Sequence, residues 1–236
     1  LVGTTSADNI KLFLFNSKAD FVIEEVYFAG STTPEGKQYL ADQYIKIYNN
    51  SDSVLYADGL VILESAFKTS QKYDYTPDIM SRAMAVQCVY AIPGNGKDYP
   101  VQPGKSLLIC DKAIDHREAN SNSFDLSNAD FEWYDDSDKN PDIDNPQVTN
   151  LDKIYSYTKT TWSLHNQGLC AYAIARLQVD KNTFLTDYTY KATYINVIGE
   201  SQDKNAYQVP NAWIIDAVNI SNKAQYAWNV VDASLD

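Results

Sequence analysis

The side chains best spaced for metal chemistry lie in an acidic stretch, residues 135–146. The candidate ligands are Asp136, Asp138, Asp142 and Asp144. Carboxylate oxygens are the ligands that calcium prefers in proteins. The stretch departs from the EF-hand pattern, because Pro141 stands where that loop has glycine and Gln147 where it has the bidentate glutamate. We expect a solvated surface loop that needs counter-charges to be buried; a calcium site of another kind is the alternative, with calcium as the one candidate cofactor.

An aromatic pair, Trp133 and Tyr134, directly precedes this stretch. Aromatic rings offer a large rigid contact surface at low entropic cost, so the pair is a candidate platform for a sugar or a peptide. Core packing is the alternative. The other tryptophans, Trp162, Trp213 and Trp228, lie in strand-like context, and we expect them in the core.

A catalytic triad needs a histidine beside a nucleophile, and the chain has two histidines, His116 and His165, and no Gly-x-Ser-x-Gly motif. We expect His116 to fix a polar loop and His165 to end a strand. No catalytic residue is predicted, and we expect that the protein is not an enzyme.

A glycosidase needs two carboxylates that flank one bond. Glu24 and Glu25 are neighbours in a predicted strand and are expected on opposite faces. Asp130 and Glu132 share a face and make the better pair, but we expect them at a solvated loop edge. Abundant acidic residues alone do not indicate a hydrolase.

The three cysteines, Cys88, Cys110 and Cys170, each lie in an apolar run, where a thiol acts as a small buried hydrophobe. A Cys88–Cys110 bridge is the alternative in an oxidising compartment.

The charge argues against nucleic acid as a partner, and the hydropathy argues against a membrane-spanning segment. The net charge is −12, with no patch of Lys and Arg, so nucleic acid is not expected as a partner. No stretch approaches the roughly 18–20 apolar residues of a membrane span, so we expect no transmembrane segment.

Short runs rich in β-branched and aromatic residues, separated by polar turns, predict an all-β fold. The predicted strands are residues 10–15, 21–28, 44–48, 54–56, 60–63, 84–92, 106–110, 161–165, 170–179, 188–198 and 213–218. In residues 44–48, Ile45 and Ile47 form the expected core face. Asp58-Gly59 predicts a hairpin or a crossover between sheets, residues 113–118 a short helical turn, and residues 199–211 a polar linker.

Several strings resemble lamin tail domains. They are Phe21 to Gly30, Gln43 to Asp52, Asp58-Gly59-Leu60, Pro103-Gly104 before Leu107-Leu108-Ile109, and Trp213 to Val218. The sequence departs from that pattern at Lys46, where an acid is usual, and at Leu60, where a tryptophan is usual. Residues 92–97, 113–116 and 123–133 are more similar to an uncharacterised family of Bacteroides-type surface lipoproteins with a lamin-tail-like domain.

The resemblance implies an immunoglobulin-like, lamin-tail-type β-sandwich with long polar loops and no established activity. It implies an extracytoplasmic location at the cell surface or outer membrane, with a lipid anchor in the full-length protein. We expect residues 17–236 to form this single domain, truncated at its C-terminus, and residues 1–16 to be the end of a preceding domain or a linker.

Taken together, these features favour a non-enzymatic binding or adhesion module of the cell surface, with a glycan or a surface protein as partner. A structural spacer or assembly domain of a larger lipoprotein is the alternative. A carbohydrate-active hydrolase is the third hypothesis.

Overall fold

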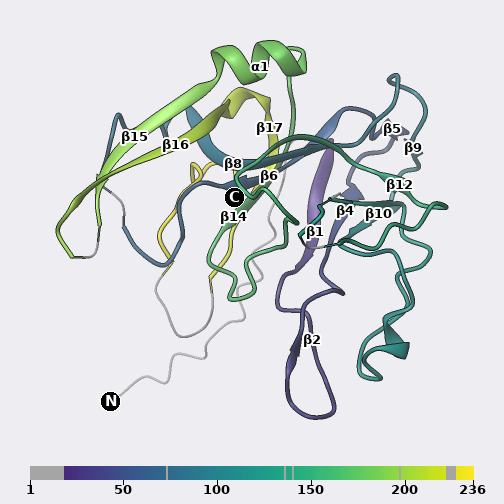
Figure 1. Cartoon of the computed structure of the whole chain (residues 1–236). Coiled ribbons are helices and arrows are strands. Elements are labelled where there is room, and N and C mark those ends of the chain that lie inside the picture. Colours follow the sequence, from purple (N-terminus) through teal and green to yellow (C-terminus); the bar gives the residue numbers. More distant parts are fainter. Residues whose placement is uncertain (1–18, 73, 136, 140, 197, 222–226) are drawn as a thin grey trace, which may run out of the picture.

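The computed structural model describes residues 19–236, apart from residues 73, 136, 140, 197 and 222–226. Strands dominate it, which confirms the all-β prediction (Figure 1). The predicted strand 10–15 and the proposed boundary at residue 16 lie outside the described residues. Within the described part of the chain, no helix is long and apolar enough to cross a membrane.

Two sheets carry most of the strands. The five-stranded sheet has the order β1 (Phe21–Tyr27), β4 (Tyr44–Asn49), β10 (Ser106–Cys110), β11 (Phe131–Glu132), β12 (Thr149–Asn150). The eight-stranded sheet has the order β17 (Ile214–Asn219), β14 (Ala171–Arg176), β6 (Leu60–Ser65), β8 (Ala83–Ala91), β16 (Ser201–Pro210), β15 (Thr189–Ile195), β7 (Tyr75–Thr76), with β13 (Asp152–Ser156) also paired to β8.

Smaller elements complete the fold. Two strand pairs are β2 (Ser31–Thr32) with β3 (Gln38–Tyr39), and β5 (Leu55–Tyr56) with β9 (Pro100–Val101). The helices are η1 (His116–Glu118), α1 (Lys181–Asp187) and η2 (Asn211–Trp213). Asp180 caps α1, because its Oδ1 accepts hydrogen bonds from the backbone N–H groups of Asn182 and Thr183.

The central strands β6, β8 and β14 are buried on both faces. In β6, Leu60 and Ile62 belong to one core cluster, whereas Val61 and Leu63 belong to another. Successive side chains of a strand point to opposite faces, so one strand contributes to both cores. Strands buried on both faces are apolar throughout, and every residue of β6 except Glu64 and Ser65 is apolar.

The first core lies between the two sheets. Ile45 and Ile47 of β4 meet Tyr90 of β8 and Tyr172 of β14 in this cluster, and each is at most 1% exposed. The expectation that the isoleucine face of residues 44–48 is buried is confirmed. In Figure 1 the central strands lie between the five-stranded sheet on one side and β15 and β16 on the other.

The second core lies on the other face of the eight-stranded sheet. α1 contributes the fully buried Phe184, and the C-terminal segment, residues 227–236, contributes Val230 and Val231. Leu235 packs against the same cluster, and its carbonyl accepts a hydrogen bond from the N–H of Ala217. The C-terminal segment therefore closes this core.

Asp58-Gly59 forms the crossover between sheets, not a hairpin, because β5 pairs with β9 while β6 enters the eight-stranded sheet. Asp58 is 6% exposed and its carboxylate accepts hydrogen bonds from the backbone N–H groups of Gly96, Asp98 and Tyr99 at 2.9–3.0 Å. Gly94 lies against this carboxylate, since its φ is +121° and an added Cβ would lie 2.3 Å from Asp58 Oδ1.

Several predicted strands are confirmed and two predictions are wrong. Residues 161–165 form no strand, because the N–H groups of Trp162 and Leu164 donate to the side chains of Asp135 and Gln43. Residues 199–211 are no linker, since β16 runs through them and pairs with β15 from Ser201 to Tyr207 and with β8 from Tyr207 to Pro210. The first residues of β16 are exposed, which explains their polar composition.

A register shift in β1 changes where its two glutamates point. The pairing of β1 with β4 shifts between Ile23 and Glu25. Glu24 then lies 3.2 Å from the ammonium of Lys46, and Glu25 is the direct cross-strand partner of Lys46, so both glutamates lie on the outer face of β4. The prediction that Glu24 and Glu25 point to opposite faces is wrong, because a β-bulge breaks the alternation.

The three cysteines are buried free thiols. Burial raises the pKa of Cys88, Cys110 and Cys170 above that of an ordinary thiol. Cys88 and Cys110 form no disulfide bridge, since Cys88 lies in the eight-stranded sheet and Cys110 in the five-stranded one.

We expect Asp58→Ala to lower the free energy of unfolding by about 2–3 kcal/mol at pH 7, because three backbone N–H groups lose a charged acceptor. Burial raises the pKa of Asp58, but the N–H groups of Asp98, Tyr99 and Gly96 outweigh burial and lower it overall. The stabilisation is therefore lost as the pH falls through the lowered pKa. Urea unfolding at pH 7 and at acidic pH measures this, with exposed Asp52→Ala as the control; equal stabilities of the two variants at pH 7 would contradict it.

Candidate functional site

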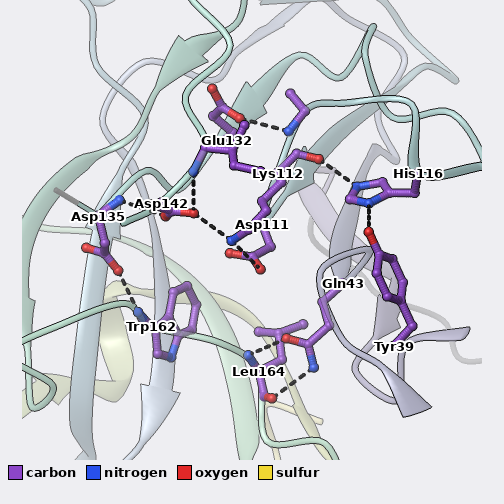
Figure 2. Close-up of polar contacts among 12 residues, drawn as sticks. Tyr39, Gln43, Asp111, Lys112, His116, Glu132, Asp135, Asp142, Trp162 and Leu164 are labelled. Atoms are coloured by element: carbon purple, nitrogen blue, oxygen red, sulfur yellow. Dashed lines mark hydrogen bonds and ion pairs between the residues drawn. The ribbon is translucent and has the colours of Figure 1, made fainter. Parts of the chain in front are cut away.

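The acidic stretch that the sequence singles out is anchored by a lysine. Asp142 has a side chain only 1% exposed, and its Oδ1 lies 2.6 Å from Lys112 Nζ (Figure 2). The Asp142 carboxylate also accepts hydrogen bonds from the backbone N–H groups of Asp135 and Ile143, at 3.1 Å and 2.9 Å. The counter-charge that the stretch needs for burial therefore comes from the loop after β10.

Lys112 is shared with a second carboxylate. Asp111 Oδ2 lies 3.5 Å from Lys112 Nζ, while Asp111 Oδ1 is buried and has no hydrogen-bond partner in the described part of the protein. Burial raises the pKa of Asp111 to about 7; Lys112 opposes this rise and Asp142 adds to it. Burial lowers the pKa of Lys112, but Asp111 and Asp142 outweigh it and raise that pKa overall. One lysine thus holds two acidic side chains.

Asp135 ties the same loop to the core between the sheets. It is 1% exposed and accepts hydrogen bonds from the Tyr90 hydroxyl of β8, at 3.0 Å and 3.1 Å, and from the N–H of Trp162 at 2.6 Å. Lys153 of β13 forms an ion pair with it. Asp135 therefore connects the loop to two strands of the eight-stranded sheet.

Glu132 and His116 hold neighbouring loops in the same way. Glu132 is fully buried and accepts from the N–H groups of Ala113 and Asn145 at 2.8 Å and 2.7 Å. His116 contacts the Tyr39 hydroxyl through Nδ1 and the Lys112 carbonyl through Nε2, both at 2.9 Å. Burial raises the pKa of Glu132 and lowers that of His116.

Gln43 completes what we call the buried polar network, which comprises Tyr39, Gln43, Asp111, Lys112, His116, Glu132, Asp135 and Asp142. Its side-chain amide exchanges two hydrogen bonds of 2.9 Å with the backbone of Leu164 (Figure 2). His116 serves loop fixation, as predicted. His165 lies apart; it is half-buried, and its N–H donates to the Tyr172 hydroxyl. Tyr39 contacts His116, and Lys112 contacts Asp111 and Asp142. The other three side chains accept hydrogen bonds from backbone N–H groups, so the network fixes loops.

The three candidate calcium ligands that the structure describes, Asp138, Asp142 and Asp144, form no metal-binding group with one another. Asp142 is held by Lys112, Asp138 is exposed, and Asp144 accepts a hydrogen bond from Asn150 at 2.9 Å. Asp136 lies outside the described residues. Among the residues that the structure describes, no three His, Cys, Asp or Glu side chains are placed to hold a metal ion.

The predicted aromatic platform is wrong for Trp133, which is fully buried and packs against Trp162 with ring centroids 5.1 Å apart. Trp133 lies two residues after Phe131, so both rings point toward the core. Tyr134 is half-buried. Asp130 and Glu132 were both expected at a solvated loop edge. This is wrong for Glu132, which is buried. Asp130 is exposed, and its carboxylate accepts a hydrogen bond from the N–H of Leu108. The two carboxylates therefore serve different loops.

An open pocket of about 620 Å³ lies elsewhere, between β7 with the residues around it and the C-terminal segment. We call it the β7 pocket. It is lined by Lys72, Asp74, Tyr75, Thr76, Asp78, Met80, Ala227, Trp228, Asn229 and Val230. Sequence reasoning missed it and assigned Trp228 to the core, but this side chain is 39% exposed. Trp162 is buried as expected, and Trp213 is partly buried against the second core.

Both walls of the β7 pocket are tied to the fold. On one wall, Tyr75 pairs with Tyr194 of β15 and stacks on Phe67 with ring centroids 4.7 Å apart. On the other wall, the N–H of Trp228 donates to the Thr69 carbonyl at 2.8 Å. Val230, which also lines the pocket, is anchored by its N–H donating to Asn219 Oδ1 at 2.9 Å.

The rim of the β7 pocket is charged. Lys72 and Asp74 are exposed and form an ion pair at 3.7 Å. Asp78 Oδ1 accepts a hydrogen bond from the N–H of Met80 at 3.0 Å. Burial, followed by the nearby charge of Asp78, raises the pKa of Tyr75. The pocket therefore combines one exposed indole with polar groups that can accept or donate hydrogen bonds.

Comparison with known proteins gives one family and one solved structure. Residues 102–236 match the model of a family described as "Protein of unknown function (DUF4876)". A crystal structure of a DUF4876 family protein from Bacteroides thetaiotaomicron VPI-5482 is similar, with a TM-score of 0.73 and 24% identity over 92% of this chain. This likeness shows a shared fold, and the chain spans 58% of the length of that protein. No curated protein matches.

We expect Lys112→Met to lower the free energy of unfolding by about 3–5 kcal/mol, because it leaves the buried Asp142 carboxylate without a counter-charge. Chemical denaturation measures the loss, and exposed Lys105→Met is the control. Adding Asp142→Asn to the Lys112→Met variant should recover part of the loss. A Lys112→Met variant as stable as the control would contradict the role of this ion pair.

We expect Asp111 to make the protein less stable as the pH rises from about 4 to about 7. The pKa of Asp111 is about 7 in the folded state against an ordinary value of 3.8. Between these values the folded state keeps a proton that the unfolded state has released, so stability falls with a slope of at most about 1.4 kcal/mol per pH unit.

Asp111→Asn removes this dependence. Its free energy of unfolding minus that of the wild type should therefore rise between pH 4 and 7 and level off above pH 7. Urea unfolding across this range tests the expectation, with Asp138→Asn as a matched substitution in the exposed part of the acidic stretch. A difference that stays constant with pH would refute it.

Proposed function

We propose that this chain, which belongs to the DUF4876 family of proteins of unknown function, is a non-enzymatic binding module that holds a glycan in the β7 pocket. The observation that carries the proposal is the exposed indole of Trp228 in an open pocket of about 620 Å³ with a polar rim. Small-molecule sites are clefts of roughly 300–1,000 Å³ with apolar walls and a few placed polar groups.

A sugar suits the chemistry of this pocket. The apolar face of a sugar ring can lie on the Trp228 indole, beside the ring of Tyr75. Its hydroxyls can then meet the carboxylate of Asp78, the amide of Asn229 and the hydroxyl of Thr76. The aromatic rings would provide the contact area for the sugar, and the polar groups would fix its orientation.

The polar groups favour binding over hydrolysis. A glycosidase needs a desolvated carboxyl as its general acid. Asp74 and Asp78, the acids of the β7 pocket, are both exposed, and Asp74 is paired with Lys72. Buried acids such as Glu132 hold loop N–H groups in the network and do not line the pocket.

We infer an immunoglobulin-like sandwich of lamin-tail type, displayed outside the cytoplasm and lipid-anchored at the cell surface in the full-length protein. The resemblance of residues such as Phe21 to Gly30 supports the fold type, as does the core cluster between the two sheets. The solved relative from a Bacteroides species is in keeping with the organism group that the resemblance indicates.

A structural spacer is the second candidate, and one observation favours it. Ile195 and Ile198, where the β15–β16 hairpin turns, are 51% and 73% exposed. Exposed aliphatic side chains at the end of a hairpin suit contact with another protein surface. If that surface belongs to a second copy of the chain, replacing both isoleucines by Ser should abolish self-association. The same variant should bind glycans as the wild type does if the β7 pocket is the functional site.

Calorimetric titration and thermal unfolding with β-1,4-linked hexamers of glucose, mannose, galactose and N-acetylglucosamine test the proposal. We expect at least one hexamer to bind and to raise the melting temperature of the wild type, because a ligand of the native state stabilises it by mass action. Trp228→Ala should weaken binding at least about tenfold, which is about 1.4 kcal/mol.

The control is Tyr157→Ala, which removes another exposed aromatic ring, 54% exposed and outside the β7 pocket. This variant should bind as the wild type does. Absence of binding by all four hexamers, or undiminished binding by Trp228→Ala, would contradict the proposed function.

A further inference from the structure

We infer that Asp78 sets the charge preference of the β7 pocket, so that the pocket accepts neutral glycans and rejects glycans that carry carboxylates. The inference rests on the glycan-binding function proposed above. It adds the substrate class and the residue that selects it.

The first observation concerns the two oxygens of Asp78. Oδ1 accepts a hydrogen bond from the N–H of Met80 at 3.0 Å, which fixes the orientation of the carboxylate. Oδ2 accepts no hydrogen bond from the residues that the structure describes, and the residue is exposed in the pocket lining. Oδ2 is therefore available to a ligand in the β7 pocket.

The second observation concerns the balance of charge. Lys72, the cation of the pocket lining, is paired with Asp74 at 3.7 Å. Within the described ranges, Asp78 takes part in no ion pair. Its charge reaches a neighbouring side chain: burial and then Asp78 raise the pKa of Tyr190 to about 12, and Arg82, which does not line the pocket, opposes them. Among the charged side chains that line the β7 pocket, Asp78 is thus the one without an ion-pair partner in the described ranges.

The chemistry of the ligand follows from these two points. An ionised carboxylate only accepts hydrogen bonds, so Asp78 needs a ligand that donates them. Sugar hydroxyls and amide N–H groups donate, whereas the carboxylate of a uronic acid only accepts and carries the same charge as Asp78. The net charge of −12 adds repulsion at long range.

The test uses a matched pair of ligands. One is whichever neutral hexamer of the four binds the wild type most tightly, and the other is the same hexamer with its C6 hydroxyls oxidised to carboxylates. Both are titrated calorimetrically at pH 7 and low ionic strength. We expect the oxidised hexamer to bind the wild type at least about tenfold more weakly.

Asp78→Asn keeps an oxygen for the N–H of Met80 and removes the charge, so it should bring the two affinities within about threefold of each other. Asp187→Asn, at the end of α1 and outside the pocket, changes the net charge equally and should leave the ratio as in the wild type. Equal or tighter binding of the oxidised hexamer to the wild type would overturn the inference. The inference would also be overturned if Asp78→Asn and Asp187→Asn reduced the ratio of the two affinities by the same factor. Failure of every neutral hexamer to bind would instead overturn the proposed function.

Discussion

Buried carboxylates are the constraint on which the loops of this protein depend. Loops have no strand ladder to satisfy their backbone N–H groups, and such groups must be paired when they are buried. Asp58 pairs three of them in the loop 94–99, and Glu132 pairs two from different loops. A carboxylate offers about four acceptor positions, so one acidic side chain can organise a whole turn. The acidic composition is thus partly a structural device.

Strands were predicted correctly where buried and exposed side chains alternate along the sequence. The prediction failed where backbone hydrogen bonds alone decide whether a segment is a strand. Residues 44–48 alternate between buried isoleucines and outward polar or aromatic side chains, so the sequence pattern was sufficient. β16 starts with Ser201 to Asn205, which are mostly exposed, and only its ladder with β15 makes it a strand. In residues 161–165 the side chains look strand-like, but Asp135 and Gln43 take the backbone hydrogen bonds that a neighbouring strand would take.

The candidate sites depend on contacts between residues far apart in the chain, which the sequence pattern does not show. The need for a counter-charge in residues 135–146 was predictable from charge density, but its source, Lys112, lies on a separate loop and has no local signal. Trp133 was a platform candidate because it adjoins a polar loop. It lies two residues after the buried Phe131, however, and its side chain points into the core in the same way. The β7 pocket combines residues 72–80 with residues 227–230, and no periodicity reports a contact between segments so far apart in the chain.

Asn219 helps to hold the C-terminal segment, which forms one wall of the β7 pocket, against the rest of the protein. Its Oδ1 accepts from the N–H groups of Val230 and Val231, and its own N–H and amide donate to Asp236 at 2.9 Å and 2.8 Å. These bonds, the N–H of Trp228 on the Thr69 carbonyl, the N–H of Ala217 on the Leu235 carbonyl and two buried valines dock the segment that carries Trp228. Most residues of this segment are partly or fully exposed, and such a segment opens more often than the buried central strands do. If the β7 pocket binds a ligand as proposed, its apparent affinity is its intrinsic affinity multiplied by the docked fraction. A substitution at Asn219, which does not line the pocket, then lowers the affinity without removing a ligand contact.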